Sequence, residues 1–279
     1  MKNAMSRTKQ HLPLSSRQKL IESLQSRIVS KLRTATQVTS ITAEHGRCQV
    51  GIRDASAFET CLTPDGLILA SGRFGPLLTQ SSLGISHVFR RLEVGVRIEQ
   101  PSGIFFLAQH KQLDPKLILK DPQKGLEWRT FCCCRQGEVV AIRHQGVIAV
   151  SGRSDVIKTD FSNIGFLVRF TDKDCSDRLW PQLLGRVRSL SVPAKMPLVD
   201  FVQSKDPQNT PIGLVLGPDV ANAIVYGLRG LLAEFGPENF NDAILHAPAM
   251  EGLARYPLFD QSLKSPDGPI WGAGDVTGL

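Results

Sequence analysis

A nine-residue stretch of the chain alternates strictly between apolar and mostly charged positions. Residues 91–99 read Arg-Leu-Glu-Val-Gly-Val-Arg-Ile-Glu. The apolar positions on one side are Leu92, Val94, Val96 and Ile98. Because successive side chains of a strand point to opposite faces, this period of two predicts a β-strand. One apolar face and one charged face are typical of antiparallel sheets, so we expect a half-exposed antiparallel strand here.

Helices and further strands are predicted around this stretch. Apolar residues recur every four positions over 15–32, which predicts an amphipathic helix. A second helix is predicted over about 218–235, with Pro218 at a first-turn position and Gly236 at its end. Alternation and turn residues predict strands, the first two forming a hairpin, at 37–42, 48–52, 137–143, 146–151, 164–170 and 244–247.

The run 67–70 differs from these strands because it is continuously apolar, reading Leu-Ile-Leu-Ala. It follows a Pro-Asp-Gly turn and ends at Ser71 and Gly72. Short uninterrupted apolar runs are typical of strands that are covered on both faces. We therefore expect 67–70 to be a strand that is buried on both sides.

The positive charge of the chain is concentrated in its first residues. The formal net charge is +7, and residues 1–33 hold eight Lys and Arg against the single acid Glu22. The remaining residues carry equal numbers of each sign, without a basic cluster larger than Arg90-Arg91. Nucleic-acid surfaces are basic and often carry aromatic residues, so we expect no nucleic-acid partner. We interpret 1–14 as a basic linker or leader.

No segment approaches the roughly 18 consecutive apolar residues that a membrane span needs, so we expect no membrane partner. The first residues also lack the apolar core of a secretory signal. We therefore expect a cytoplasmic protein. The alternative is an organellar protein, because the basic, acid-poor start resembles a transit peptide in composition.

The cysteines and histidines do not form a recognisable metal or nucleophile motif. The six cysteines stand at 48, 61, 132, 133, 134 and 175, without a Cys-x-x-Cys pair or a Cys/His set at zinc spacing. The six histidines are scattered along the chain. We therefore expect no metal, and we reject hydrolase and metalloenzyme interpretations.

A glycine-rich segment follows the apolar residues Ile270 and Trp271, reading Gly-Ala-Gly-Asp over 272–275. The first turn of a dinucleotide fold is followed by a helix and a second strand within about 30 residues, which are absent here. We instead expect this segment to return to a nucleotide-binding domain that begins earlier in the chain. Asp275 is flanked by glycines that permit close approach of a ligand, so it is a candidate acceptor for sugar-type hydroxyls.

Several stretches together resemble the poorly characterised FAD-dependent dehydrogenases (oxidoreductases), whose FAD domain is of the two-part glutathione-reductase type. The stretches are 67–72 with 271–275, Gly-Arg-Phe-Gly at 72–75, 93–99, Arg-Thr-Phe-Cys at 129–132 with 137–140, and Val-Ser-Gly at 150–152. They occur in the family's order, and the resemblance covers about 15–279.

The resemblance implies an α/β protein with an inserted α+β domain. A partial FAD/NAD(P)-binding Rossmann-like domain would comprise 15–78 and return at 256–279. A mixed-sheet middle domain, the substrate domain, would comprise 79–255. The implied cofactor is FAD, and the implied cofactor-binding residues are Val38, Ser71, Gly72, Arg73, Gly274 and Asp275.

The resemblance also places Arg129, Cys132, Cys134 and Glu138 on the wall of the middle domain that faces the flavin, with Arg129, Cys132 and Glu138 as candidate catalytic residues. Arginine binds anionic substrates through two parallel hydrogen bonds. The alternatives are structural: buried cysteine often packs as a small apolar residue, and an acid on a strand is often simply solvated.

One feature of such flavoproteins is missing, because Gly-x-Gly-x-x-Gly occurs nowhere in the chain. We therefore expect the C-terminal portion of an FAD-dependent oxidoreductase, incomplete for cofactor binding. Its partners would be a small-molecule substrate, which the sequence does not identify, and the missing N-terminal FAD-binding unit. The alternative is a non-catalytic remnant or subunit that acts as a protein-interaction module.

Overall fold

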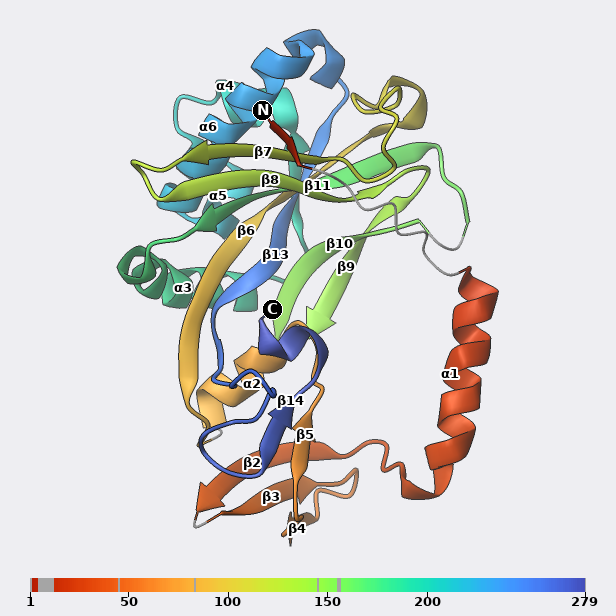
Figure 1. The fold of residues 1–279 in the computed structure, drawn as a ribbon. Coiled ribbons are helices and arrows are strands. Elements are labelled where there is room, and N and C mark those ends of the chain that lie inside the picture. The colour runs from red at the N-terminus through yellow and green to blue at the C-terminus, as the bar shows by residue number, and fades with distance from the viewer. Residues whose placement is uncertain are drawn as a thin grey trace. The chain divides into compact units, whose positions relative to one another are not determined.

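The computed structural model describes residues 2–4, 13–44, 46–82, 84–144, 146–154 and 157–278 (Figure 1). The chain divides into two compact units. Unit 1 comprises Met1–His11 and Arg91–Ala254, and unit 2 comprises Leu12–Arg90 and Arg255–Leu279. The architecture is mixed α/β, with several separate sheets. None of the helices in the described ranges is both long enough and apolar enough to cross a membrane.

Unit 1 is built on a seven-stranded sheet in the order β1-β7-β8-β11-β6-β13-β12 (Figure 1). The strands are β1 (Lys2–Ala4), β6 (His87–Pro101), β7 (Lys116–Asp121), β8 (Leu126–Cys134), β11 (Phe161–Phe170), β12 (Ala194–Pro197) and β13 (Ile244–Pro257). The pairings of β8 with β11 and of β11 with β6 are antiparallel. The predicted strands at 91–99, 164–170 and 244–247 are confirmed, although β6 and β13 are much longer than predicted.

The prediction that residues 91–99 are half-exposed is wrong. Glu93 and Arg97, on the face expected to meet solvent, are both fully buried. The reason is that neighbouring strands supply partners for these charges: Arg129 and Arg169 for Glu93, and Asn163 for Arg97. A charged side chain can be buried when it is paired and hydrogen-bonded.

Unit 1 also contains a hairpin and four α-helices in its described residues. The hairpin pairs β9 (Glu138–His144) with β10 (Val147–Arg153), which confirms the predicted strands at 137–143 and 146–151. The helices are α3 (Lys173–Arg188), α4 (Leu198–Gln203), α5 (Pro211–Leu216) and α6 (Pro218–Phe235). Single 3-10 turns lie at η2 (Ser102–Ile104), η3 (Pro207–Asn209) and η4 (Pro237–Phe240).

Helix α6 confirms the prediction for 218–235 and packs against the sheet through Trp128 of β8. Pro218 occupies the first turn, and Gly236, with φ of 84°, ends the helix. The indole of Trp128 is fully buried and donates a hydrogen bond to the carbonyl oxygen of Ala223 at 2.7 Å. Because a Cβ atom on Gly227 would lie 2.6 Å from the indole nitrogen, this glycine allows the close approach of helix and ring.

Unit 2 contains a three-stranded antiparallel sheet and a separate pair of parallel strands. The sheet is formed by β2 (Gln37–Glu44), β3 (Arg47–Arg53) and β4 (Glu59–Leu62), and the parallel pair by β5 (Leu67–Leu69) and β14 (Ile270–Gly272). The predicted hairpin at 37–42 and 48–52 is confirmed. The helical segments are α1 (Leu14–Ile28), η1 (Val29–Lys31), α2 (Gly75–Ser82) and η5 (Gly274–Thr277). One apolar cluster, which includes Ile41, Val50, Leu69 and Ile270, joins the two sheets.

Two apolar segments of unit 2 remain exposed. Helix α1 confirms the helix predicted over 15–32, continued by η1, but none of its residues is buried. The prediction that 67–70 is buried on both faces is wrong, because Leu69 is buried whereas Ile68 is 68% exposed. The physical reason is that the apolar cluster of the unit covers the face of β5 that carries Leu69, whereas the described residues leave the face that carries Ile68 open.

The close contact between α6 and Trp128 can be tested with two helical glycines. Alanine is a better helix former than glycine by about 1 kcal/mol. At Gly227, however, a methyl group would displace a buried and hydrogen-bonded indole, so G227A should lower the free energy of unfolding by about 1–3 kcal/mol. Gly185 in α3 has open space around the position of a Cβ atom, so G185A should raise the free energy of unfolding by about 0.5–1 kcal/mol. Urea unfolding measures both values, and a stabilised G227A variant would contradict the packing argument.

Candidate functional site

The carboxyl ends of the parallel strands β5 and β14 lead into two glycine turns of unit 2. The strands run side by side, with Leu69 opposite Gly272, and the amide of Ala273 donates to the carbonyl oxygen of Leu69 at 2.8 Å. Gly72 follows β5 with φ of 70°, and Gly274 follows β14 with φ of 73°. Ligands of α/β sheets bind outside the carboxyl ends of parallel strands.

The positions of Gly72 and Gly274 have unoccupied space beside the backbone. No heavy atom of the described residues lies within 4 Å of where a Cβ atom of either glycine would stand. Glycine is therefore used here for its left-handed backbone and not to avoid a packed neighbour. The arrangement exposes the backbone of both turns to a molecule that approaches from outside.

The two turns lie close together because α2 starts between them. A Cβ atom on Gly75, the first residue of α2, would lie 2.9 Å from the Cβ of Ser71 and 3.0 Å from a methyl carbon of Val276. The amide of Gly75 also donates to the carbonyl oxygen of Gly72 at 3.0 Å. The turn after β5, the start of α2 and η5 are thus packed around one point.

Asp275 is exposed in the first turn of η5. An exposed carboxylate accepts hydrogen bonds from hydroxyl groups. The structure therefore brings four of the predicted cofactor-binding residues into this region, namely Ser71, Gly72, Gly274 and Asp275. Half-buried Arg73 follows in the same turn, whereas Val38 is 43% exposed on β2, which belongs to the other sheet of the unit.

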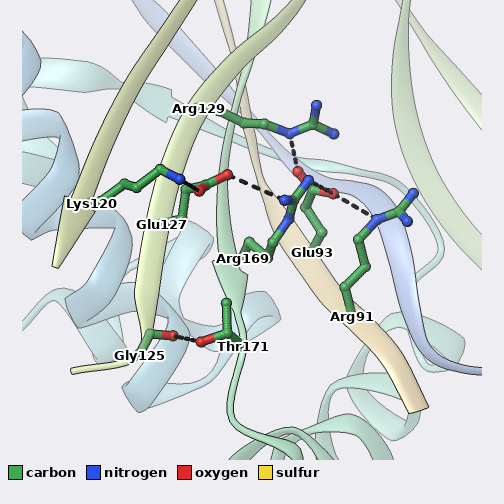
Figure 2. Close-up of polar contacts among 8 residues, drawn as sticks. All are labelled: Arg91, Glu93, Lys120, Gly125, Glu127, Arg129, Arg169 and Thr171. Atoms are coloured by element: carbon green, nitrogen blue, oxygen red, sulfur yellow. Dashed lines mark hydrogen bonds and ion pairs between the residues drawn. The ribbon is translucent and has the colours of Figure 1, made fainter. Parts of the chain in front are cut away.

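Unit 1 has a different polar arrangement, a row of alternating charges across four strands of its sheet (Figure 2). In the strand register, Lys120 of β7 lies opposite Glu127 of β8, Glu127 opposite Arg169 of β11, and Arg169 opposite Glu93 of β6. The ion-pair distances along this charge row are 2.8 Å for Lys120–Glu127, 3.2 Å for Glu127–Arg169 and 3.5 Å for Arg169–Glu93.

Glu93 is the last member of the charge row and is fully buried. In addition to Arg169, its carboxylate accepts hydrogen bonds from the Nε atoms of Arg91, at 3.2 Å, and of Arg129 (Figure 2). Three guanidinium groups thus surround one carboxylate. Sequence reasoning missed Glu93 and Arg169, because an acid or an arginine in an alternating strand is normally interpreted as exposed.

Arg129 is the predicted catalytic residue that belongs to this cluster. Its Nε atom bonds to Glu93, its side chain is 24% exposed, and its guanidinium lies 5.9 Å from the centre of the Phe131 ring. No hydrogen bond from its two Nη atoms to another described residue is found. The guanidinium is held in one orientation by Glu93 and keeps donors for a further acceptor.

The other two predicted catalytic residues lie elsewhere in unit 1. Glu138, at the start of β9, pairs with Arg153 of β10 in an exposed ion pair on the hairpin. Cys132 is exposed near the end of β8, beside Arg97 of β6. The contacts of the described residues therefore do not join Arg129, Cys132 and Glu138 into one catalytic cluster. The described residues contain no cluster of three or more His, Cys, Asp or Glu side chains that could hold a metal ion.

Comparison with known proteins gives only distant similarities. No family model and no curated protein matches the chain. RebC-10x, in native and K252c-bound form, shares 13% identity over 92% of this chain and 35% of its own, with a TM-score of 0.37. A complex of aklavinone-11 hydroxylase with FAD and aklavinone shares 14% identity over 93% of this chain and 36% of its own, with a TM-score of 0.35.

A flavoprotein/dehydrogenase from Cytophaga hutchinsonii shares 12% identity over 96% of this chain and 48% of its own, with a TM-score of 0.34. The chain thus spans about a third of the length of the first two proteins and about half of the third. Similarity at this level supports no conclusion about this chain, whose function must be inferred from its own residues.

The buried position of Glu93 can be tested against an exposed acid of the same unit. Removing the charge in E93Q leaves three arginines around a neutral amide, and breaking a buried ion pair costs about 3–5 kcal/mol of unfolding free energy. The matched control is E138Q, whose ion pair with Arg153 is about half exposed and should contribute less than about 1 kcal/mol. Equal losses for the two variants in urea unfolding would show that Glu93 does not hold the sheet.

Proposed function

We propose that this chain provides the C-terminal portion of an FAD-dependent oxidoreductase. The observation that carries the proposal is the pair of open glycine turns at the carboxyl ends of β5 and β14, with the exposed carboxylate of Asp275 beside them. A glycine with left-handed φ and free space beside it lets a ligand reach the backbone. FAD supplies hydride or electron chemistry, and the protein supplies binding and orientation.

The residues present fit one part of FAD. The carboxylate of Asp275 is an acceptor for the hydroxyls of the ribityl chain, and the backbone at Gly72 and Gly274 accommodates a flat or extended group at close range. The chain has no Gly-x-Gly-x-x-Gly sequence, which in dinucleotide folds cradles the pyrophosphate. The pyrophosphate and adenosine would therefore be held by a further FAD-binding unit, on the same or on another polypeptide.

The edge of β5 is the place where such a unit would pair. Parallel strands are normally covered on both faces and belong to larger sheets, because a lone pair buries too little apolar surface. Among the described strands, β5 has β14 as its sole neighbour, and its Ile68 is 68% exposed. A parallel strand of an FAD-binding βαβ unit would fit this edge and cover Ile68.

Unit 1 would bind the substrate. Arg129 is fixed by Glu93 and retains donors for a substrate anion, and this is the reason to assign it a role in binding. Cys132 and Glu138 remain candidates for roles near the reacting atoms. The substrate itself is not specified by these residues beyond its negative charge.

Titration with flavin fragments tests the role of Asp275. Riboflavin contains the polyol chain and ADP lacks it, so D275A should weaken riboflavin and FAD binding at least about tenfold, the value of a hydrogen bond to a charged acceptor, and leave ADP unaffected. The matched control is D65A, since Asp65 is exposed before the opposite end of β5. Quenching of flavin fluorescence measures the affinities. Failure of the unmodified chain to bind either flavin would contradict the proposal, as would equal effects of both variants.

Light scattering tests the free edge of β5 and also addresses the alternative of a protein-interaction module. An exposed apolar strand edge promotes association, and a charge placed there suppresses it. I68K should therefore reduce concentration-dependent self-association of the chain. V192K is the control, because Val192 is equally exposed, at 66%, but lies in a loop of unit 1. Association that persists unchanged in I68K would exclude this edge as the contact.

A further inference from the structure

Arg97 of β6 is a fully buried arginine that has no carboxylate partner among the described residues. Its Nε donates to Oδ1 of Asn163 at 2.8 Å, and its Nη2 donates to the carbonyl oxygen of Cys132 at 2.7 Å and lies 3.7 Å from Sγ of Cys134. Its Nη1 is buried without a hydrogen-bond partner among the described residues, as is Nδ2 of Asn163. The cluster contains unmet donors and an uncompensated positive charge.

The charge of Arg97 needs a counter-ion. A guanidinium keeps its proton in proteins, and an isolated charge in the interior is strongly unfavourable. Among the groups that contact Arg97, the thiol of Cys134 is the one that can become negative, and Cys132, whose carbonyl oxygen contacts Arg97, carries a second thiol two residues away. A thiolate next to a cation is the reactive form of cysteine.

The backbone of β8 places two cysteines beside this charge. Phe131 pairs with Gly165 and Cys134 with Asn163, so two residues of β8, Cys132 and Cys133, oppose a single residue of β11. Such a β-bulge redirects side chains and is often found next to functional sites. Cys132 has φ of 52°, a left-handed conformation that is uncommon for residues other than glycine.

Gly152 of β10 fixes the position of the guanidinium. A Cβ atom on this glycine would lie 2.6 Å from Cζ of Arg97 and 2.6 Å from Oδ1 of Asn163. The guanidinium therefore packs directly on the backbone of β10 and cannot move far from the thiols. Exposure differs between the two cysteines: Cys132 is exposed, whereas Cys134 is 4% exposed.

We propose that Cys132 and Cys134 form a peroxide-sensitive dithiol whose negative charge is balanced by Arg97, in which the exposed sulfur of Cys132 meets the peroxide and the buried thiol of Cys134 resolves the oxidised product. The inference does not depend on flavin binding, because every group that it uses belongs to unit 1.

Hydrogen peroxide is the oxidant in this reaction. The thiolate of Cys132 attacks one peroxide oxygen, an S–O bond forms, the O–O bond breaks, and hydroxide leaves, so that the sulfur becomes a sulfenic acid. The sulfur of Cys134 then attacks that of Cys132. An S–S bond forms, the S–O bond breaks, and the departing hydroxide takes the thiol proton of Cys134 and leaves as water. A dithiol reductant reverses the reaction.

The surrounding charges agree with this division of roles. The hydrogen bond from Cys134, and then the charge of Arg97, lower the pKa of Cys132 to about 6. Lys116 also lowers this pKa, whereas loss of solvent around the sulfur and the charge of Asp114 raise it. The same hydrogen bond, together with burial, raises the pKa of Cys134. Burial raises the pKa of Cys133 to about 11. Cys132 is therefore the attacking thiolate at neutral pH, and Cys134 keeps its proton.

Mass spectrometry of the whole chain after treatment with hydrogen peroxide at pH 7 tests the proposal. Remaining thiols are blocked with N-ethylmaleimide, and trypsin releases residues 130–135, which contain the three adjacent cysteines. This peptide should lose two hydrogens and carry one maleimide, at peroxide concentrations that leave exposed Cys61 fully blocked by maleimide. Three maleimides on the peptide, under conditions that oxidise Cys61, would overturn the proposal.

Single substitutions assign the two cysteines. C133S is the matched control and should form the disulfide as before, whereas C134S should stop at a sulfenic acid on Cys132 that dimedone labels. A C133S variant without the disulfide, or a C134S variant without labelling, would refute the assignment.

The role of the charge is tested by the pH dependence of alkylation with iodoacetamide. The rate at Cys132 should follow the thiolate, with a midpoint near pH 6 instead of the value near 8.5 of an ordinary thiol. R97K should keep a low midpoint and R97M should raise it by at least about one pH unit, with circular dichroism confirming that both are folded. If R97M does not fold, the midpoint of the unmodified chain decides the question. A midpoint near 8.5 there would disprove the influence of Arg97 on the thiol.

Discussion

A row of paired charges crosses four strands of the sheet of unit 1 and includes the fully buried carboxylate of Glu93. Lys120, Glu127, Arg169 and Glu93 alternate in sign on four adjacent strands and lie opposite one another in the register. A shift of one residue in any of these strands would turn its charge to the other face of the sheet and leave its partners unpaired. The ion pairs therefore add to the apolar pattern in favouring this register. Their contribution lies in selecting one arrangement, because the desolvation of buried ions offsets much of their attraction.

The same sheet contains one charge that is not matched in this way. Glu93 is surrounded by three arginines, whereas Arg97, four residues further along β6, contacts an amide, a carbonyl oxygen and a thiol. Both residues are fully buried, so their surroundings decide what each can do. The carboxylate of Glu93 has partners on every side and therefore acts in holding the sheet together. The guanidinium of Arg97 has an unpaired donor and can stabilise negative charge on a neighbouring sulfur.

Local patterns predicted much of the secondary structure and little of the burial. The bounds of α6 follow from a proline at its start and a glycine at its end, and the β9–β10 hairpin follows from alternation around a turn. Both signals are local. By contrast, the burial of Glu93 depends on arginines at 129 and 169, which pairing with distant segments brings near. Likewise, periodicity predicted helix α1 but could not show that its apolar residues would remain exposed.

The candidate sites follow the same division between local and distant information. The glycines at 72 and 274 could be identified from sequence because a turn that needs positive φ favours glycine, and Asp275 stands directly beside one of them. The group formed by Arg97, Cys132 and Cys134 could not, since its bulge and its cation come from separate strands. Each place has a capacity that the described residues do not use: free space beside a left-handed backbone in one, and a buried guanidinium without a carboxylate partner in the other. Folding alone favours pairing such a charge, so a buried guanidinium without a carboxylate is the stronger of the two reasons to look for a reaction, whereas the open glycine turns gain their meaning from the strand ends and the carboxylate beside them.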